Sequence, residues 1–172
     1  MWPFRGRRRQ DGGRDDLLRR GSRALRRRRF DEAIELLEAA VRLGAQDAAA
    51  RNNLGTAYHL RGQHAQSLEH FEAAAQLKPD DAAPVLNLAA AHNALGHIAE
   101  AVELLEQLRT RHPTHQDVNF NLAIAYHRQG RTKEAVEALQ RELKLNPKSR
   151  HATSLLRQIV GQIAERASGS RE

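Results

Sequence analysis

The sequence contains no cysteine, and this absence excludes several kinds of chemistry at once. Disulfides, iron–sulfur clusters and thiol catalysis all need the cysteine sulfur, so none of them is open to this chain. Aromatic residues are also scarce, at 4% of the chain. A β-sandwich or an α/β enzyme of this size usually contains more aromatic and β-branched residues. The composition therefore favours helices, because the abundant Ala, Leu, Arg, Glu and Gln are good helix formers.

Long apolar runs are missing as well. No run approaches the roughly 20 residues that a helix needs to cross a bilayer. Paired arginines follow the first residues, but no apolar stretch of signal-peptide length comes after them, so we expect neither a Sec nor a twin-arginine signal. We therefore expect a cytoplasmic protein. The many Ala and Arg residues and the few lysines indicate a GC-rich bacterial source.

The net charge of +7 is concentrated at one end of the chain. Residues 1–30, called the basic segment below, contain 12 arginines and 3 aspartates, which gives +9. The other residues contain 28 − 12 = 16 Lys and Arg against 21 − 3 = 18 Asp and Glu, which gives −2. A mildly acidic body thus carries a strongly basic segment.

A period of 34 residues runs through most of the sequence, and it is the strongest structural signal. The rows are Pro79, Pro113 and Pro147; Gly62, Gly96 and Gly130; Leu54, Leu88 and Leu122; Ala57, Ala91 and Ala125; Ala33, Ser67, Ala101 and Ala135; and Leu37, Phe71, Leu105 and Leu139. Residues of one row are similar in size, as expected if each repeat forms the same structural unit.

Each repeat reads as two helices joined by a turn. In the second repeat Leu54, Ala57 and Tyr58 share one helical face, and Gly62 permits the left-handed conformation that ends a helix. A second apolar helix follows, and Pro79 ends it because proline cannot donate a backbone hydrogen bond. The sequence therefore predicts a series of helical hairpins.

The residues at these offsets resemble those of the tetratricopeptide repeat family. The matching residues are Asn53 to Tyr58, Gly62, Phe71, Ala74 and Pro79. Ser67 stands where the family prefers alanine, and Arg51 stands where it favours tryptophan. The resemblance covers residues 14–149. It implies an all-α fold, a right-handed α-solenoid of about four helix-turn-helix repeats with a C-terminal capping helix.

The predicted domain organisation follows this period. We predict repeats at about 14–47, 48–81, 82–115 and 116–149, with a capping helix at 150–166 that completes a repeat domain over 14–166. A flexible basic tail at 1–13 and a frayed end at 167–172 flank the domain. The first repeat is the most divergent, because Arg28 replaces the turn glycine and Ala45 replaces the proline.

Three asparagines are the leading candidates for a binding site. Asn53, Asn87 and Asn121 share one offset on the first helix of each repeat, although asparagine is a poor residue inside helices. The resemblance implies that this helix lines a concave groove, where an amide can donate to and accept from the main chain of a bound peptide. Further groove candidates are His59, Asn93, His127 and Arg128. The alternative is that the asparagines are tolerated residues that face solvent.

We therefore expect a scaffold or adaptor that binds a peptide or a protein partner. The alternative function is a factor that its basic segment anchors to nucleic acid or to an anionic membrane. The arginines concerned are Arg5, Arg7, Arg8, Arg9, Arg19, Arg20, Arg23, Arg26, Arg27, Arg28 and Arg29. A solubilising tail is the third interpretation of the same residues. The partner's identity and the oligomeric state stay open.

Catalysis and metal binding have little support in the sequence. The chain has 9 histidines, but none pairs with another at i, i+4 on one helix beside a third ligand; His112 and His115, for instance, flank Pro113 in a turn. No nucleophile motif, phosphate-binding loop or catalytic carboxylate pair is present. We expect no catalytic residue, no metal, no cofactor and no enzymatic activity.

Overall fold

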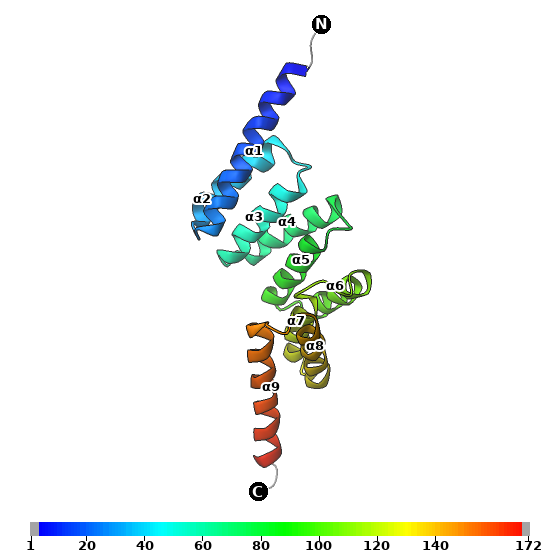
Figure 1. The fold of residues 1–172 in the computed structure, drawn as a ribbon. Coiled ribbons are helices and arrows are strands. Elements are labelled where there is room, and N and C mark those ends of the chain that lie inside the picture. The colour runs from blue at the N-terminus through cyan, green and yellow to red at the C-terminus, as the bar shows by residue number, and fades with distance from the viewer. Residues whose placement is uncertain (1–3, 170–172) are drawn as a thin grey trace. The chain divides into compact units, whose positions relative to one another are not determined.

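The structure, a computed structural model, describes residues 4–169, and within them every regular element is a helix (Figure 1). The helices are α1 Phe4–Arg26, α2 Phe30–Leu43, α3 Ala48–Leu60, α4 His64–Leu77, α5 Ala82–Leu95, α6 Ile98–Arg111, α7 Val118–Arg128, α8 Thr132–Leu145 and α9 Arg150–Gly169. The predicted all-α architecture is confirmed. The chain divides into two compact units, Met1–Leu95 and Gly96–Glu172, so α1 to α5 form the first unit and α6 to α9 the second.

The two ends of the chain differ from the prediction. Helix α1 begins at Phe4, so the backbone is already helical where we expected a flexible tail. The reason is that arginine and glutamine are good helix formers, and Gly12 and Gly13 are not enough to end the helix. Helix α9 begins at Arg150, as predicted for the capping helix, and continues to Gly169, into the segment expected to fray. Residues 1–3 and 170–172 lie outside the described residues.

Glycine allows the two helices of a hairpin to approach closely in the first unit. A Cβ atom added to Gly55 of α3 would lie 2.7 Å from Cδ1 of Phe71, whose side chain on α4 is fully buried. A Cβ atom on Gly21 of α1 would likewise lie 2.6 Å from Cγ of Leu37 on α2. Both distances are shorter than any van der Waals contact, so these hairpins pack too tightly for a larger residue.

The turn after the first helix of each predicted repeat uses a left-handed residue. Gly62, Gly96 and Gly130 have φ angles of 84°, 85° and 75°. Arg28 occupies the same position in the first repeat and adopts a φ of 58°. The following residue, Arg29, donates its backbone N–H to the oxygen of Ala24 at 3.0 Å, which closes this turn. The turn thus survives without glycine, at a cost of about 1–2 kcal/mol for the side chain in this conformation.

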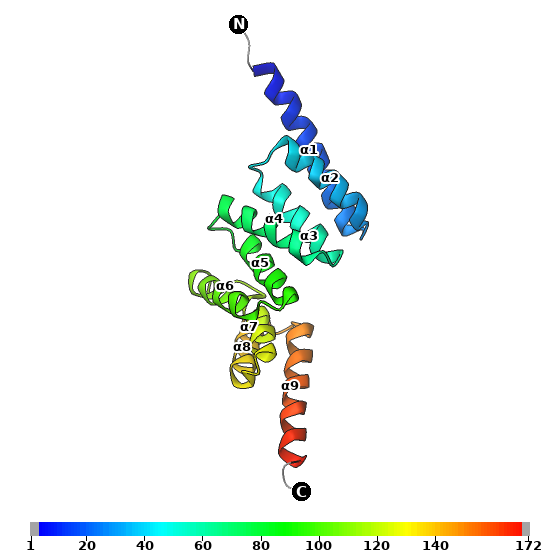
Figure 2. The same ribbon diagram turned by 180° about the vertical axis from the view of Figure 1, so that it is seen from behind.

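Each unit has an apolar core that is built mainly from residues of the repeat rows. In the first unit a buried cluster forms between α1, α2 and α3 from Ala24, Ala33, Leu37, Leu54 and Ala57. In the second unit Leu105, Leu122 and Leu139 are fully buried. Helix α9 packs against α8 and buries Ile159 completely, whereas Ile163 of the predicted capping face is 45% exposed. Only the first part of α9 therefore acts as a cap, and the rest extends past α8 (Figure 2).

Candidate functional site

Two of the three predicted asparagines connect the first helices of neighbouring repeats. Nδ2 of Asn53 on α3 donates to Oγ of Ser22 on α1 at 2.9 Å. Nδ2 of Asn87 on α5 donates to Oδ1 of Asn52 on α3 at 3.0 Å. All four side chains are half-buried. They are called the polar row below, and they hydrogen-bond across the helix contacts α1–α3 and α3–α5.

The polar row keeps spare hydrogen-bonding capacity. An amide group has two N–H donors and an oxygen with two lone pairs, and each amide of Asn53 and Asn87 uses one donor between the helices. The asparagines thus help to fix the helix contacts and still offer polar atoms at a half-buried surface. Ser22 and Asn52 were not identified from the sequence as part of this site. Asn52 could have been found, because it lies directly beside the candidate Asn53 in the sequence.

Asn121 behaves differently from the other two. Its Nδ2 donates to the backbone oxygen of Asp117 at 2.9 Å, at the start of its own helix α7 in the second unit. Asp117 precedes that helix with a left-handed φ of 71°. Asn121 therefore closes the first turn of α7, and the structure brings only Asn53 and Asn87 into one row.

The remaining groove candidates are partly withdrawn from the surface. His59 lies with its Nδ1 at 3.3 Å from Nδ1 of His64, and burial lowers its pKa, with the charge of His64 as a second cause. Asn93 is only 6% exposed. His127 is half-buried, and Arg128 is exposed. Of these four residues, Arg128 alone presents its side chain openly.

A tyrosine–glutamate pair occurs once in each unit, and sequence reasoning missed both pairs. The hydroxyl of Tyr58 on α3 donates to Oε1 of Glu38 on α2 at 2.6 Å, and that of Tyr126 on α7 donates to Glu106 on α6. Burial and the carboxylate together raise the pKa of each tyrosine to about 12. Each pair connects the second helix of one repeat to the first helix of the next. The spacing of 20 residues in both pairs was the available signal.

Glu142 is a buried carboxylate that the repeat pattern does not require. It is fully buried on α8, at a position where the first two repeats have Ala40 and Ala74. Its Oε1 accepts the backbone N–H of Asp117 at 3.4 Å, beside the start of α7. Burial raises its pKa, and hydrogen bonds from the backbone oppose that shift. The backbone N–H of Asp117 therefore offsets only part of the cost of burying this carboxyl group beside the start of α7.

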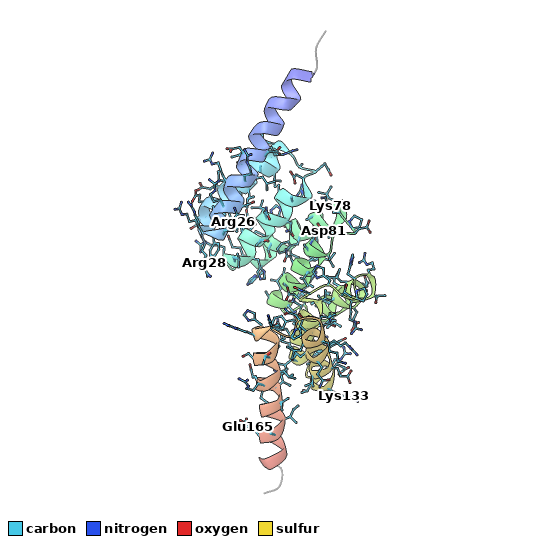
Figure 3. The ribbon with its side chains drawn as sticks, viewed as in Figure 1. Arg26, Arg28, Lys78, Asp81, Lys133 and Glu165 are labelled. Carbon is cyan, nitrogen blue, oxygen red and sulfur yellow. The ribbon has the colours of Figure 1, made fainter. Side chains whose placement is uncertain are left out.

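The basic segment exposes several arginines near the turn between α1 and α2, where Figure 3 shows Arg26 and Arg28. Arg19 and Arg20 pair with Asp16 at 3.4 and 3.6 Å, and Arg29 pairs with Glu32 at 3.2 Å. A small pocket of about 130 Å³ is lined by Arg20, Arg23, Ala24, Arg27, Arg29 and Glu32. The side chains of Arg5, Arg7, Arg8 and Arg9 lie outside the described residues.

Two further features of the described residues bear on other classes of function. No group of three or more His, Asp or Glu side chains in this part of the chain is placed to hold a metal ion. None of the helices between residues 4 and 169 is long and apolar enough to cross a membrane.

Helical hairpins repeated at this period define an α-helical repeat protein, and comparison with known families identifies the repeat. Sequence models of the tetratricopeptide repeat match residues 18–82, 59–111 and 94–159. The chain therefore belongs to the tetratricopeptide repeat family. Proteins of this family are generally non-enzymatic scaffolds for protein–protein interaction, and membership of the family supports a scaffold role for this chain.

Solved structures share the fold at low sequence identity. The protein YrrB, described as a TPR protein with an unusual peptide-binding site, is 21% identical; the match covers 78% of this chain and 70% of YrrB with a TM-score of 0.71. A thermophilic TPR protein of Thermus thermophilus, TTC0263, is 20% identical over 87% of this chain and 82% of its own, with a TM-score of 0.78. PilF of Pseudomonas aeruginosa is 19% identical over 91% and 71%, with a TM-score of 0.79. No curated protein matches the sequence.

Proposed function

We propose that this scaffold binds an extended segment of a partner protein along the first helices of its repeats. The half-buried polar row carries the proposal, because Asn53 and Asn87 offer donors and acceptors beyond those used between the helices. The similarity to YrrB, which is described as having a peptide-binding site, supports the same class of ligand. The repeat domain at 14–166 is the part that we propose to carry out this binding.

Recognition by such a row depends on the partner's main chain more than on its side chains. Amide groups bind N–H and C=O groups that every peptide has, and each net hydrogen bond contributes about 0.5–1.5 kcal/mol. We propose that Asn121 and Arg128 of α7 form a separate set of polar contacts in the second unit, where the exposed Arg128 adds positive charge. The half-buried His127 has a smaller role there. We give His59 and Asn93 a smaller role, because burial withdraws them from the surface.

The test captures partners from a lysate of the source organism with the full chain and with Asn53→Ala/Asn87→Ala. The control is Gln66→Ala/Gln76→Ala, which removes two exposed amides from α4 in the same unit. We expect the first variant to lose partners that the parent and the control retain. Equal capture by all three proteins would mean that the recognition surface lies elsewhere.

A second candidate function is binding of the basic segment to nucleic acid or anionic membranes. The observation that favours it is the small pocket lined by Arg20, Arg23, Arg27 and Arg29. Binding of a DNA oligonucleotide or of phosphatidylserine vesicles should weaken steeply as salt rises, and Arg23→Gln/Arg27→Gln should weaken it further. If the full chain binds neither probe at low salt, the segment serves only as a solubilising tail. The cytoplasmic location and the bacterial source also stay predictions.

A further inference from the structure

The second unit contains an apolar pocket with a basic rim, built from the end of α6, the start of α7 and the end of α8. Its volume is about 450 Å³, and its lining residues are Arg109, Thr110, Pro113, Asn119, Arg141, Lys144 and Leu145. Pro113, Leu145 and the carbon stems of the long cations supply its apolar surface. None of the lining residues is acidic, so the pocket presents positive charge around an apolar floor.

The preceding repeats provide an internal reference for these residues. At the positions 34 residues earlier, Ala75 corresponds to Arg109, Gln107 to Arg141, Thr110 to Lys144 and Val85 to Asn119. Around this pocket the later repeat therefore has three cations where the earlier repeat has alanine, glutamine and threonine, and an asparagine where the earlier repeat has valine. The fold does not need these four changes, because the equivalent positions form the same helices without them.

Asn119 is the changed residue that points most directly to a ligand. The residue is only 2% exposed, and its buried Oδ1 has no hydrogen-bond partner among the described residues. A buried amide without a partner destabilises the protein by about 1–3 kcal/mol relative to a satisfied one. Valine, the equivalent residue Val85, would avoid this cost. Since Asn119 lines the pocket, its amide group is placed to hydrogen-bond a main-chain group bound there.

The cations on the rim are only partly neutralised. Arg141 pairs with Glu137 at 3.7 Å, and Arg109 pairs with Glu106. Lys144 has no ion pair among the described residues, and it is exposed. Neither of the two paired glutamates lines the pocket, so the rim remains available to carboxylates from outside.

We propose that this pocket is a second docking site, which binds an acidic peptide segment through an apolar side chain on its floor, carboxylates at Arg141 and Lys144, and the main chain at Asn119. The site goes beyond the proposed function, because it shares no residue with the polar row or with the α7 residues assigned to the extended segment. A scaffold with two separate surfaces can hold two protein segments at once.

Two short fluorescein-labelled peptides test the proposal in fluorescence anisotropy with the full chain. Leucine alternates with glutamate in the first peptide and with lysine in the second. The pocket variants adopt the residues of the preceding repeat, Arg141→Gln/Lys144→Thr and, separately, Asn119→Val. The control is Lys133→Thr/Arg157→Gln, which removes the same charge at exposed positions of α8 and α9; Lys133 is labelled in Figure 3. The arginines of α1 also attract acidic peptides. The contribution of the pocket is therefore measured as the difference in peptide affinity between the pocket variant and the control.

We expect the glutamate peptide to bind the parent and the control alike, and the double pocket variant about tenfold more weakly. Asn119→Val should weaken binding while circular dichroism and thermal stability stay at or above the parent's values. The proposal is overturned if the pocket variants bind the glutamate peptide as well as the control does, or if the lysine peptide binds as tightly as the glutamate peptide. Each of these results leaves the test of the polar row unaffected.

Discussion

Replacing Gly55 by alanine tests the packing of the α3–α4 hairpin. In an open helix this change stabilises by about 1 kcal/mol, because alanine is the better helix former. Here the new Cβ would lie 2.7 Å from Cδ1 of Phe71, a side chain that is 2% exposed and has no room to withdraw. Overpacking of a core costs about 1–3 kcal/mol, so we expect a net loss of up to about 2 kcal/mol.

The second half of the test removes the obstacle. Phe71→Leu alone should cost about 1–1.5 kcal/mol, and Gly55→Ala/Phe71→Leu should be no less stable than Phe71→Leu, since the fourth repeat has Ala123 and Leu139 at these positions. The coupling between the two changes should then be favourable by about 1–3 kcal/mol.

Denaturant unfolding measures all four proteins of this cycle. The control is Gly161→Ala in α9, where a Cβ would meet nothing within 4 Å and where we expect a gain of about 0.5–1 kcal/mol. If Gly55→Ala stabilises the protein as much as the control does, the close approach of α3 and α4 is refuted.

Three further predictions concern titratable groups. Both tyrosines should ionise with a pKa near 12 rather than 10.0 in alkaline absorbance spectra. Because the chain has two tyrosines, Tyr58→Phe should halve the absorbance change on ionisation. The stability that each pair contributes is present below pH 10.0 and lost as pH rises through about 12. His59→Gln should reduce the loss of stability in acid, because a lowered histidine pKa gives stability that is present above pH 6.5 and lost as pH falls. The free energy of unfolding of Glu142→Gln should rise relative to that of the parent as the pH goes from acid to neutral. The reason is that the raised pKa of Glu142 gives the parent stability that is present below pH 4.5 and lost as pH rises. A difference in urea unfolding that does not depend on pH would contradict this prediction.

The sequence predicted the fold well because its signal is repeated. Each row of the 34-residue period shows the same packing position several times. One atypical residue in a row therefore does not obscure the pattern. Arg28 shows the strength of this redundancy, since the turn forms there although glycine is missing. The helical state of residues 4–13 was missed because no repeat row extends into that segment, and composition alone did not separate a helix from a tail.

The candidate site was harder to predict because identical offsets do not guarantee identical partners. The side chain of Asn87 donates a hydrogen bond to Asn52 on the neighbouring helix, whereas that of Asn121 donates to the backbone oxygen of Asp117 at the start of its own helix. The difference arises from residues outside the rows, which sequence periodicity does not compare. Glu142 was missed for a related reason: the other repeats have apolar residues at its position, and a buried carboxylate there depends on the nearby N-terminus of α7.

Hydrogen–deuterium exchange of the full chain, alone and with a partner captured from the source lysate, tests the central claim most directly. If an extended partner segment lies along the first helices, amide protection in the first unit should rise on α3 and α5, and this rise should disappear in Asn53→Ala/Asn87→Ala. Protection that rises only on α2 and α4, or only on α1, would contradict the proposal and assign the partner to the second helices or to the basic segment.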